Sequence, residues 1–234
     1  MKHLTPIPGR LPRYQLEGEP MKSRLDPSTA ARQSRERWDS QFSAPGTYVP
    51  ALDALMQILD AKDGYTALHC RRVRELAQLV AVKMDWQPLM VRTTMLAAYY
   101  HDIGKLGICN CVLNKPGRLS PAEREAMQRH PTVGRELIES FLIVQRAAVV
   151  IEQHHESWDG SGYPHGAAED NILPEARILR VCDVYDALVT DRPYRQGYAH
   201  DEAAQIIREG IGTEFEPQAA ETLLCVTQQL RMAA

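Results

Sequence analysis

From residue 50 onward, apolar residues recur every three or four positions, which is the spacing of one buried helix face. Helix-start signals precede several of these stripes: Pro88, the capping box from Ser120 to Glu123, and Pro174. The alternation typical of a half-buried strand does not extend beyond short pairs in loops. The spacing therefore predicts an all-α bundle. Its expected helices cover about residues 52–62, 65–84, 88–102, 121–131, 133–141, 144–155, 174–189, 201–210 and 217–230, and residues 104–118 are expected to form a loop.

The first 46 residues differ from the rest in composition and charge. They are rich in Pro, Arg, Ser and Gln, and eight Lys or Arg against five Asp or Glu give them a net charge of +3. Since the whole chain carries −3, the remainder carries −6. We expect residues 1–46 to be a disordered or loosely attached tail, with a docking segment for a protein partner as the alternative, and residues 47–234 to form one domain. A negatively charged domain has no general attraction for DNA or RNA.

The sequence indicates neither a membrane segment nor a secretion signal. No run approaches the ~18 apolar residues of a spanning helix, and the first residues lack the apolar region of a signal peptide. Five cysteines, an odd number without framework spacing, are typical of a reducing cytoplasm rather than of disulfides. The spacing of Cys109 and Cys111, with no second pair, argues against structural zinc. We expect a cytoplasmic protein.

The pair His101-Asp102 ends one expected helix and supplies a ring nitrogen beside two carboxylate oxygens. Two metal ions ~3.5–4 Å apart can share a carboxylate and a water. A helical turn would bring Lys105 to the same face, where its ammonium could contact a phosphate. Taken alone, the pair is equally well explained as a cap or an ion pair.

Other titratable residues lie in otherwise apolar helical stretches, where a buried polar side chain needs a partner. Asp183 is the strongest case, because its helix is apolar nearly all round. A salt bridge to Arg180 is the structural alternative to a metal. His69 alone is explained as a core histidine. Together with His130 and the doublet His154-His155, however, these residues indicate one shared metal pair.

A loop containing Gly and Pro follows the doublet, over about residues 157–171. Loops of this length in compact domains are commonly functional. Trp158 and Tyr163 lie in this loop outside any apolar period. We therefore expect both rings to be exposed and able to stack on a base, with core packing as the alternative.

Several separate motifs occur in an order that resembles the HD-GYP family, a branch of the HD-domain metal phosphohydrolases. The resemblance extends from about residue 48 to the end of the chain. It implies an HD-domain helical bundle with an additional helical and loop HD-GYP extension. It also implies hydrolysis of the bacterial second messenger cyclic di-GMP to linear pGpG by a hydroxide bridging two metals, with onward cleavage to GMP left open. The motifs are HDIGK at 101–105, HP at 130–131, HHE at 154–156, GSGYP at 160–164 and RPYR at 192–195.

Carried over by position, the resemblance implies two groups of metal ligands that share one aspartate. The implied ligands are His69, His101, Asp102 and Asp183 for one metal and His130, His154 and His155, with Asp102 bridging, for the other. Asp102 and Lys105 are the implied catalytic residues. The implied substrate-binding residues are Gly162, Tyr163, Pro164, Lys115, Arg177, Asp186 and Arg192. The family implies iron or manganese, and zinc, nickel or magnesium are alternatives.

Two departures from the family pattern bear on this site. Cys109-Asn110 stands where the family has Pro-Asp, which leaves the contacts of that loop open. Tyr65 stands one helical turn before His69, where three-metal members have a glutamate, and a phenol is a poor ligand for a divalent ion. We therefore predict two divalent ions per chain.

Two other functions are open alternatives. One is an HD phosphohydrolase that acts on another cyclic dinucleotide. The other is a catalytically silent module that binds cyclic di-GMP or a protein. The complete ligand set favours catalysis over the silent module. A homodimer is also left open.

Overall fold

The computed structural model describes residues 49–64, 66–141, 145–191 and 196–233. Regular structure in these ranges is helical, apart from an isolated bridge between Ile211 and Phe215. The all-α prediction is confirmed. The elements are α2 (Val49–Lys62), α3 (Thr66–Lys83), α4 (Pro88–Tyr100), η1 (Ile103–Gly107), α5 (Asn110–Leu113), α6 (Pro121–Met127), α7 (His130–Ile138), α8 (Gln145–Gln153), η3 (Glu169–Asn171), α9 (Pro174–Val189), α10 (His200–Glu209) and α11 (Pro217–Ala233).

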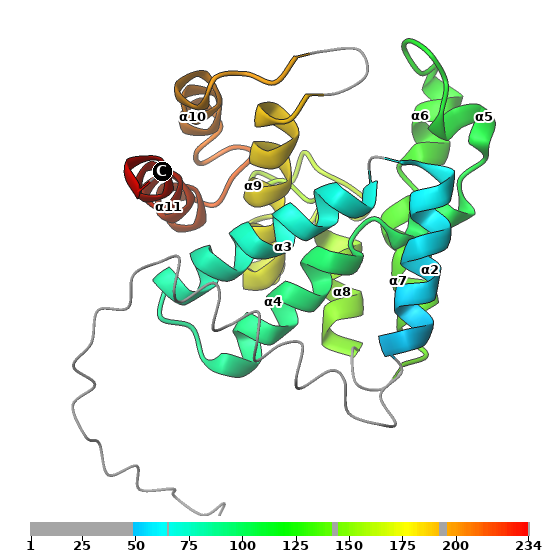
Figure 1. Cartoon of the computed structure of the whole chain (residues 1–234), viewed down its shortest axis with the longest axis horizontal. Helices are drawn as coiled ribbons and strands as arrows, with labels where there is room; N and C mark the ends of the chain where they lie inside the picture. Colours follow the sequence, from blue (N-terminus) through cyan, green and yellow to red (C-terminus); the bar gives the residue numbers. More distant parts are fainter. Residues whose placement is uncertain (1–48, 65, 142–144, 192–195, 234) are drawn as a thin grey trace, which may run out of the picture.

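The helices α3, α4 and α9 form the centre of the bundle, where α3 packs along both α4 and α9 (Figure 1). Helix α8 closes the core against α4, and α7 packs on both α8 and η1. Helices α10 and α11 pack on α9, on the side of the bundle away from α2 and α7 (Figure 1). Residues such as Val73, Ala97 and Leu179 are fully buried where these elements meet. The titratable residues predicted as ligands come from these same packed elements.

Several helix boundaries follow the predicted signals. Helix α9 begins at Pro174, and both capping-box bonds are present at α6, from the Glu123 amide to Ser120 Oγ (3.4 Å) and from the Ser120 amide to Glu123 Oε2 (2.7 Å). Two predictions are wrong. His130-Pro131 begins α7 instead of ending a helix, since a proline in the first turn needs no amide donor. Residues 104–118 are not a plain loop, because they contain most of η1 and all of α5.

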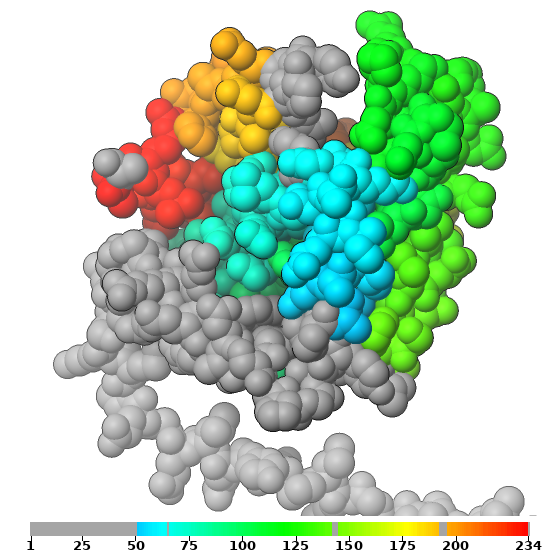
Figure 2. Space-filling view, turned by 45° about the vertical axis from the view of Figure 1, so that its right-hand side comes forward, coloured from blue at the N-terminus to red at the C-terminus, as the bar shows by residue number. Residues whose placement is uncertain are grey.

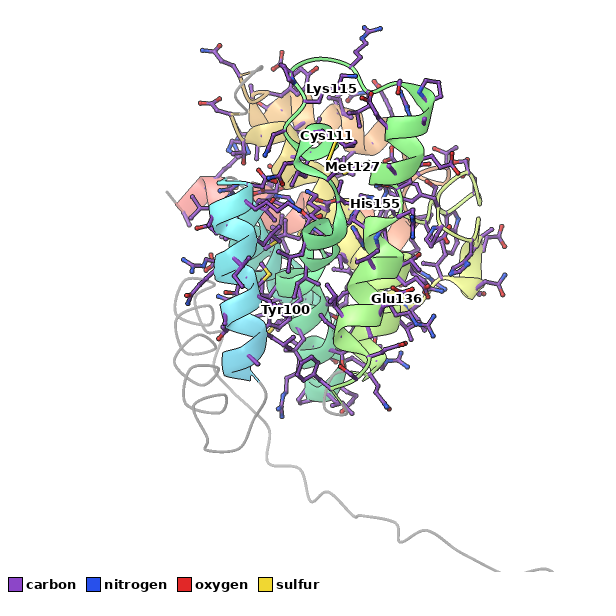
Figure 3. The ribbon with its side chains drawn as sticks, turned by 90° about the vertical axis from the view of Figure 1, so that its right-hand side faces the viewer. Tyr100, Cys111, Lys115, Met127, Glu136 and His155 are labelled. Atoms are coloured by element: carbon purple, nitrogen blue, oxygen red, sulfur yellow. A yellow bond between two sulfur atoms is a disulfide. The ribbon has the colours of Figure 1, made fainter. Side chains whose placement is uncertain are left out.

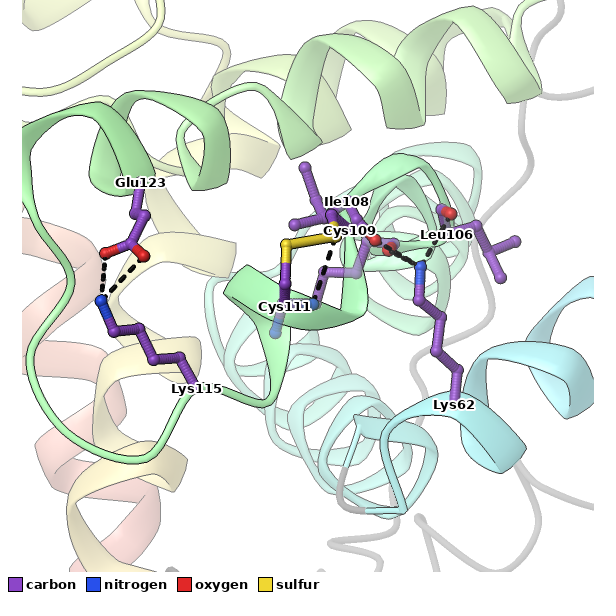
Figure 4. Close-up of a disulfide and its surroundings, with 8 residues drawn as sticks. Lys62, Leu106, Ile108, Cys109, Cys111, Lys115 and Glu123 are labelled. Carbon is purple, nitrogen blue, oxygen red and sulfur yellow. Dashed lines mark hydrogen bonds and ion pairs between the residues drawn. A yellow bond between two sulfur atoms is a disulfide. The ribbon is translucent and has the colours of Figure 1, made fainter.

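The cysteines also differ from the prediction in one place. A disulfide joins Cys109 and Cys111, whose Cα atoms are 5.3 Å apart, a separation that a disulfide spans (Figure 4). Cys70 and Cys182 are buried free thiols, and Cys225 is exposed. The expectation of unpaired cysteines is therefore wrong for this pair, because the turn that starts α5 brings two nearby residues together.

Some predictions concern parts of the chain outside the described residues. The tail at residues 1–46, Tyr65 and the substrate-binding candidate Arg192 belong to this group. Among the helices that the structure does describe, none combines the length and apolar character needed to cross a membrane.

Two neighbouring residues of α2 test the core assignment. Leu59 is fully buried, whereas the side chain of Ile58 is 57% exposed. We expect Leu59→Ala to lower the free energy of unfolding by about 2–5 kcal/mol, because it leaves a cavity in the core. Ile58→Ala should change it by about 0.5 kcal/mol or less. Urea unfolding followed by circular dichroism measures both values, and equal effects would contradict the position of α2.

Candidate metal centre

Side chains from five elements converge in the core of the bundle. His69 comes from α3, the pair His101-Asp102 directly follows α4, and His130 begins α7. The doublet His154-His155 directly follows α8, and Asp183 lies within α9. Their potential ligand atoms form two groups, and within each group these atoms lie within 4.8 Å of one another. The two groups are His69 with His101 and Asp183, and His130 with His154 and His155.

Asp102 lies between the two groups and is almost fully buried. Its Oδ1 is 3.5 Å from Nε2 of His130, and its Oδ2 is 3.5 Å from Nε2 of His101. The ammonium of Lys105 donates to the same Oδ2 at 2.8 Å. One carboxylate thus offers one oxygen to each group, which is the placement that a bridging ligand requires.

Three of the histidines each have a hydrogen bond of the same kind, which fixes the orientation of the ring. In each, Nδ1 lies close to the carbonyl oxygen three residues earlier: Ala98 for His101 (2.8 Å), Met127 for His130 (2.9 Å) and Ile151 for His154 (2.5 Å). A carbonyl oxygen only accepts, so Nδ1 carries the proton. When these rings are neutral, Nε2 therefore presents a lone pair to the centre, as metal-binding histidines do.

The donor atoms fit a divalent metal pair. Nε2 of His101 is buried and has no hydrogen-bond partner. Nε2 of His130 and Nε2 of His154 are 3.3 Å apart, and both carry lone pairs in the tautomer just described. Two lone pairs at this distance repel unless a cation lies between or beside them. Nitrogen and carboxylate donors together suit iron, manganese or zinc.

Burial and neighbouring charges keep one side of the centre neutral. Burial, only partly offset by Asp102, lowers the pKa of His130 to about 4. Burial and the neighbouring imidazole of His155 hold the pKa of His154 well below its usual value. The neutral imidazole is the form that binds a metal, so these rings are available as ligands at neutral pH.

The other side of the centre has basic rings and strongly acidic carboxyls. Burial lowers the pKa of His69, but its bonds to Asp183 and Asp186 outweigh this and raise the pKa to about 9. Burial raises the pKa of Asp102, but Lys105 and His101 outweigh it and hold the pKa well below its usual range. The carboxylates thus require a cation here, and a proton on a ring competes with a metal for that role.

Asp186 is placed differently from the prediction of a substrate-facing residue. Its Oδ2 accepts the Nδ1 proton of His69 at 2.7 Å, while Nε2 of His69 lies 3.0 Å from Asp183 Oδ1. Arg72 donates to the two oxygens of Asp186 at 2.7 and 2.9 Å. Asp186 therefore lies behind a predicted ligand and orients its ring. Arg72 completes this arrangement, and its role is not predictable from the sequence because an arginine on a helix gives no signal of its own.

His155 differs from the other histidines in its partner. Nη1 of Arg180 lies 3.0 Å from Nδ1 of His155, and because arginine only donates, this Nδ1 accepts. A neutral His155 therefore carries its proton on Nε2 and binds a metal through that atom only by losing it. Arg180 also bonds Glu214 at 2.5 Å, and no described contact joins it to Asp183 as the salt-bridge alternative requires. The ring of Tyr163 stacks on His155 with centroids 4.8 Å apart.

The loop after the doublet is held by its own backbone. A methyl group on Gly162 would lie 2.2 Å from the Ser157 nitrogen, so only glycine allows this approach. The buried carboxylate of Glu156 accepts the amides of His165 (2.8 Å) and Ala167 (3.0 Å). Tyr163 and Pro164 are thereby fixed and half-buried, with the Tyr163 ring beside His155, whereas the predicted position of Tyr163 is exposed.

Two further substrate-binding candidates have partners away from the ligand groups. The guanidinium of Arg177 lies over the Trp158 ring at 4.9 Å and donates to Asp170 and to the Ile172 carbonyl. Trp158 is thus half-buried, with one face of its ring against Arg177. Lys115 is bonded to both carboxylate oxygens of Glu123, at the end of the molecule where Cys111 also lies (Figure 3).

The segment that carries Lys105 is anchored by Lys62, a residue that no sequence pattern indicates. Nζ of Lys62, the last residue of α2, donates to the carbonyls of Lys105 (3.1 Å), Leu106 (2.9 Å) and Ile108 (2.5 Å) (Figure 4). These bonds satisfy carbonyls at the end of η1. From sequence alone, a lysine in the last turn of a helix is explained by its own helix.

Comparison with known proteins identifies the family to which the chain belongs. The HD-domain family model matches residues 53–219, so the chain belongs to the HD-domain family. The predicted resemblance to the HD-GYP branch is confirmed by curated relatives named as cyclic di-GMP phosphodiesterases.

Two curated relatives and one solved structure illustrate the proteins to which this chain is similar. The cyclic di-GMP phosphodiesterase response regulator of Xanthomonas campestris is 38% identical over 181 residues, which cover 76% of this chain and 48% of the relative. A 3′3′-cGAMP-specific phosphodiesterase of Vibrio cholerae is 37% identical over 173 residues, which cover 73% and 37%. The chain thus spans less than half of these relatives. A solved HD-GYP-type protein of Bdellovibrio bacteriovorus has the same fold, with a TM-score of 0.61 and 22% identity over 88% of this chain and 74% of that one.

Gly104 tests whether the packing of η1 on α7 forms the centre. A methyl group there would lie 1.9 Å from the His130 carbonyl oxygen and 2.5 Å from the Gly134 nitrogen. We expect Gly104→Ala to lower the free energy of unfolding by about 1–3 kcal/mol, and to lower metal content because His130 moves. Gly64→Ala is the matched control, since the nearest atom would be 3.9 Å away. Thermal unfolding and elemental analysis measure both effects, and a Gly104→Ala protein that matches the control would contradict this packing.

Proposed function

We propose that the chain hydrolyses a phosphodiester bond of a cyclic dinucleotide, with cyclic di-GMP as substrate and linear pGpG as the main product. The observation that carries this proposal is the position of Asp102, whose two oxygens face two separate groups of metal donors. The names of the relatives give the substrate class, and cyclic di-GMP is the substrate in several of them.

The metal ligands in this proposal are the predicted set. His69, His101, Asp102 and Asp183 would hold one divalent ion, and His130, His154 and, after loss of its Nε2 proton, His155 would hold the other together with Asp102. A bound pair supplies Lewis-acid stabilisation of charge on a phosphodiester and lowers the pKa of a water molecule. The chain itself orients the rings through backbone carbonyls and excludes bulk water by burying the ligands.

Lys105 is the proposed proton donor. Burial lowers the pKa of its ammonium, but Asp102 outweighs this and raises it, so the group stays protonated. Its side chain is 22% exposed, which leaves it within reach of a ligand while Asp102 fixes its position. We assign it to the scissile phosphate, where it stabilises the leaving oxygen.

The loop around Tyr163 is the proposed substrate contact. One face of the phenol ring stacks on His155, so a base would contact the other face or the ring edge. Gly162 and Pro164 position this ring, and Arg192 and Lys115 stay predicted substrate-binding residues. Arg177 and Asp186 act instead through Trp158 and His69, which are their partners in the structure.

Other parts of the proposal concern the whole protein. We propose two ions per chain, iron or manganese, and a cytoplasmic location. A protein partner for residues 1–46 and a homodimer stay predictions.

A substrate panel tests the proposed reaction. Protein loaded with manganese or iron is incubated with cyclic di-GMP and, separately, with 3′3′-cGAMP, and the products are separated by chromatography. We expect linear pGpG with a higher kcat/KM for cyclic di-GMP. A higher value for 3′3′-cGAMP would support the second candidate substrate, which the similarity to a cGAMP-specific relative favours. Binding of both without turnover would support the silent module.

Two variants separate metal binding from chemistry. We expect Asp102→Asn to lose both ions, because it removes the shared charge, with Asp60→Asn on the exposed face of α2 as the control. Lys105→Met should keep the metal but lower kcat by about 10²–10³, the loss typical of one stabilising donor. Its control is Lys83→Met, at the exposed end of α3. Elemental analysis and steady-state kinetics measure the two effects. Full metal content in Asp102→Asn, or unchanged kcat in Lys105→Met, would contradict the assigned roles.

A further inference from the structure

The disulfide between Cys109 and Cys111 follows η1, the turn that carries Lys105, but takes no part in the proposed reaction. Both cysteines are exposed, on the part of the chain between η1 and α6. In the space-filling view this bright green region projects beyond the blue surface of α2 (Figure 2). Exposed disulfides are the ones that external thiols reduce, whereas buried structural ones resist reduction. We infer that Cys109 and Cys111 form a reversible thiol–disulfide exchange site whose reaction partner is a dithiol.

The other cysteines make this pair distinct. Cys70 and Cys182 are fully buried, so external thiols do not reach them. Cys225 is exposed, but its thiol is free. The chain therefore has one pair of sulfur atoms that is both accessible and joined. Disulfides of proteins in reducing compartments are mostly transient and serve catalysis or redox sensing.

The exchange reaction transfers two electrons from the external dithiol to the disulfide of the protein. A thiolate of the external dithiol attacks one sulfur of the pair, the S–S bond breaks, and the other cysteine leaves as a thiolate that takes up a proton. The second thiol of the reductant then displaces the first cysteine from the mixed disulfide. The reductant becomes a disulfide, and the protein gains two thiols. Oxidation by a dithiol–disulfide partner follows the same steps in reverse.

The backbone connects this pair to the proposed proton donor. Cys109 directly follows Ile108, whose amide bonds the Lys105 carbonyl at 3.1 Å. Lys62 donates to the carbonyl oxygens of Lys105 and Ile108, so the segment from 105 to 108 is held as one unit. On the other side, the amides of Val112 and Leu113 bond the Cys109 carbonyl at 2.9 Å each. Opening the disulfide removes the covalent link across the start of α5 and leaves these hydrogen bonds to hold the turn, and this change reaches Lys105 through Ile108.

A thiol count tests the exchange site without any reference to activity. On a Cys225→Ser background, maleimide labelling of the native protein with peptide mapping should find no reactive thiol before treatment. After dithiothreitol, and after equilibration in glutathione buffers, it should find two, at Cys109 and Cys111. Two reactive thiols before any reductant, or none after it, would overturn the inference.

Hydrogen exchange tests the connection to the site in the full-length chain. We expect reduction to speed exchange of the amides of residues 112–114 by about tenfold, the factor that loop-closure entropy gives for a three-residue loop. Cys109→Ser with Cys111→Ser should match the reduced protein under both conditions, and Cys225→Ser should match the wild type. Unchanged exchange would overturn the connection.

The kcat of the phosphodiesterase reaction is a further measurement of the connection, and it rests on the proposed function. With manganese loaded after the reductant is removed, reduction should lower kcat in the wild type and leave the double serine variant unaffected. An equal kcat in oxidised and reduced wild type would overturn the effect on the site. If both forms lack activity, the proposed function fails, while the thiol count and hydrogen exchange still decide whether the exchange site exists.

Discussion

The arrangement of this bundle depends on the cost of burying Asp102. A carboxylate with so little exposure is stable only beside positive charge or strong donors. The structure supplies Lys105 from the next turn and directs His101 and His130 at its two oxygens. Only His130 comes from a separate helix, α7, so the stabilisation of the Asp102 charge depends on the packing of η1 on α7.

The remaining polar residues of the core support these ligands in a consistent way. Three histidines use a carbonyl three residues earlier to fix the tautomer, which a helix end or a first turn provides without any additional side chain. His69 lies within α3, where its own backbone carbonyls are already used, and it relies on Asp186 and Arg72 instead. The position of a histidine in its helix therefore decides whether its support comes from backbone or from side chains.

The difference between support from the local backbone and support from distant side chains explains how much of the fold and of the site the sequence predicts. Periodicity and capping depend on neighbours in the chain, so α9 and the start of α6 are predicted correctly. The anomaly of Asp183 in an apolar helix correctly indicates a polar centre, and His69 lies beside it. The boundary at His130 is wrong because proline is equally compatible with the end of one helix and the start of the next. Long-range partners such as Lys62 and Arg180 leave no periodic signal, and the positions of Arg177 and Asp186 depend on such partners.

The short segment from Asp102 to Cys111 is where these constraints meet. A 3₁₀ turn has poorer hydrogen bonds than an α-helix and is rarely stable by itself. The η1 turn is instead held from outside, by Lys62 at its carbonyls, by the close approach of Gly104 to α7, and by the cysteine pair that follows it. The helices of the bundle are stabilised by their own apolar packing, so a change in this segment can alter the position of Lys105 while the bundle stays folded. A segment with this property is suited to adjust the chemistry of the site without unfolding the domain.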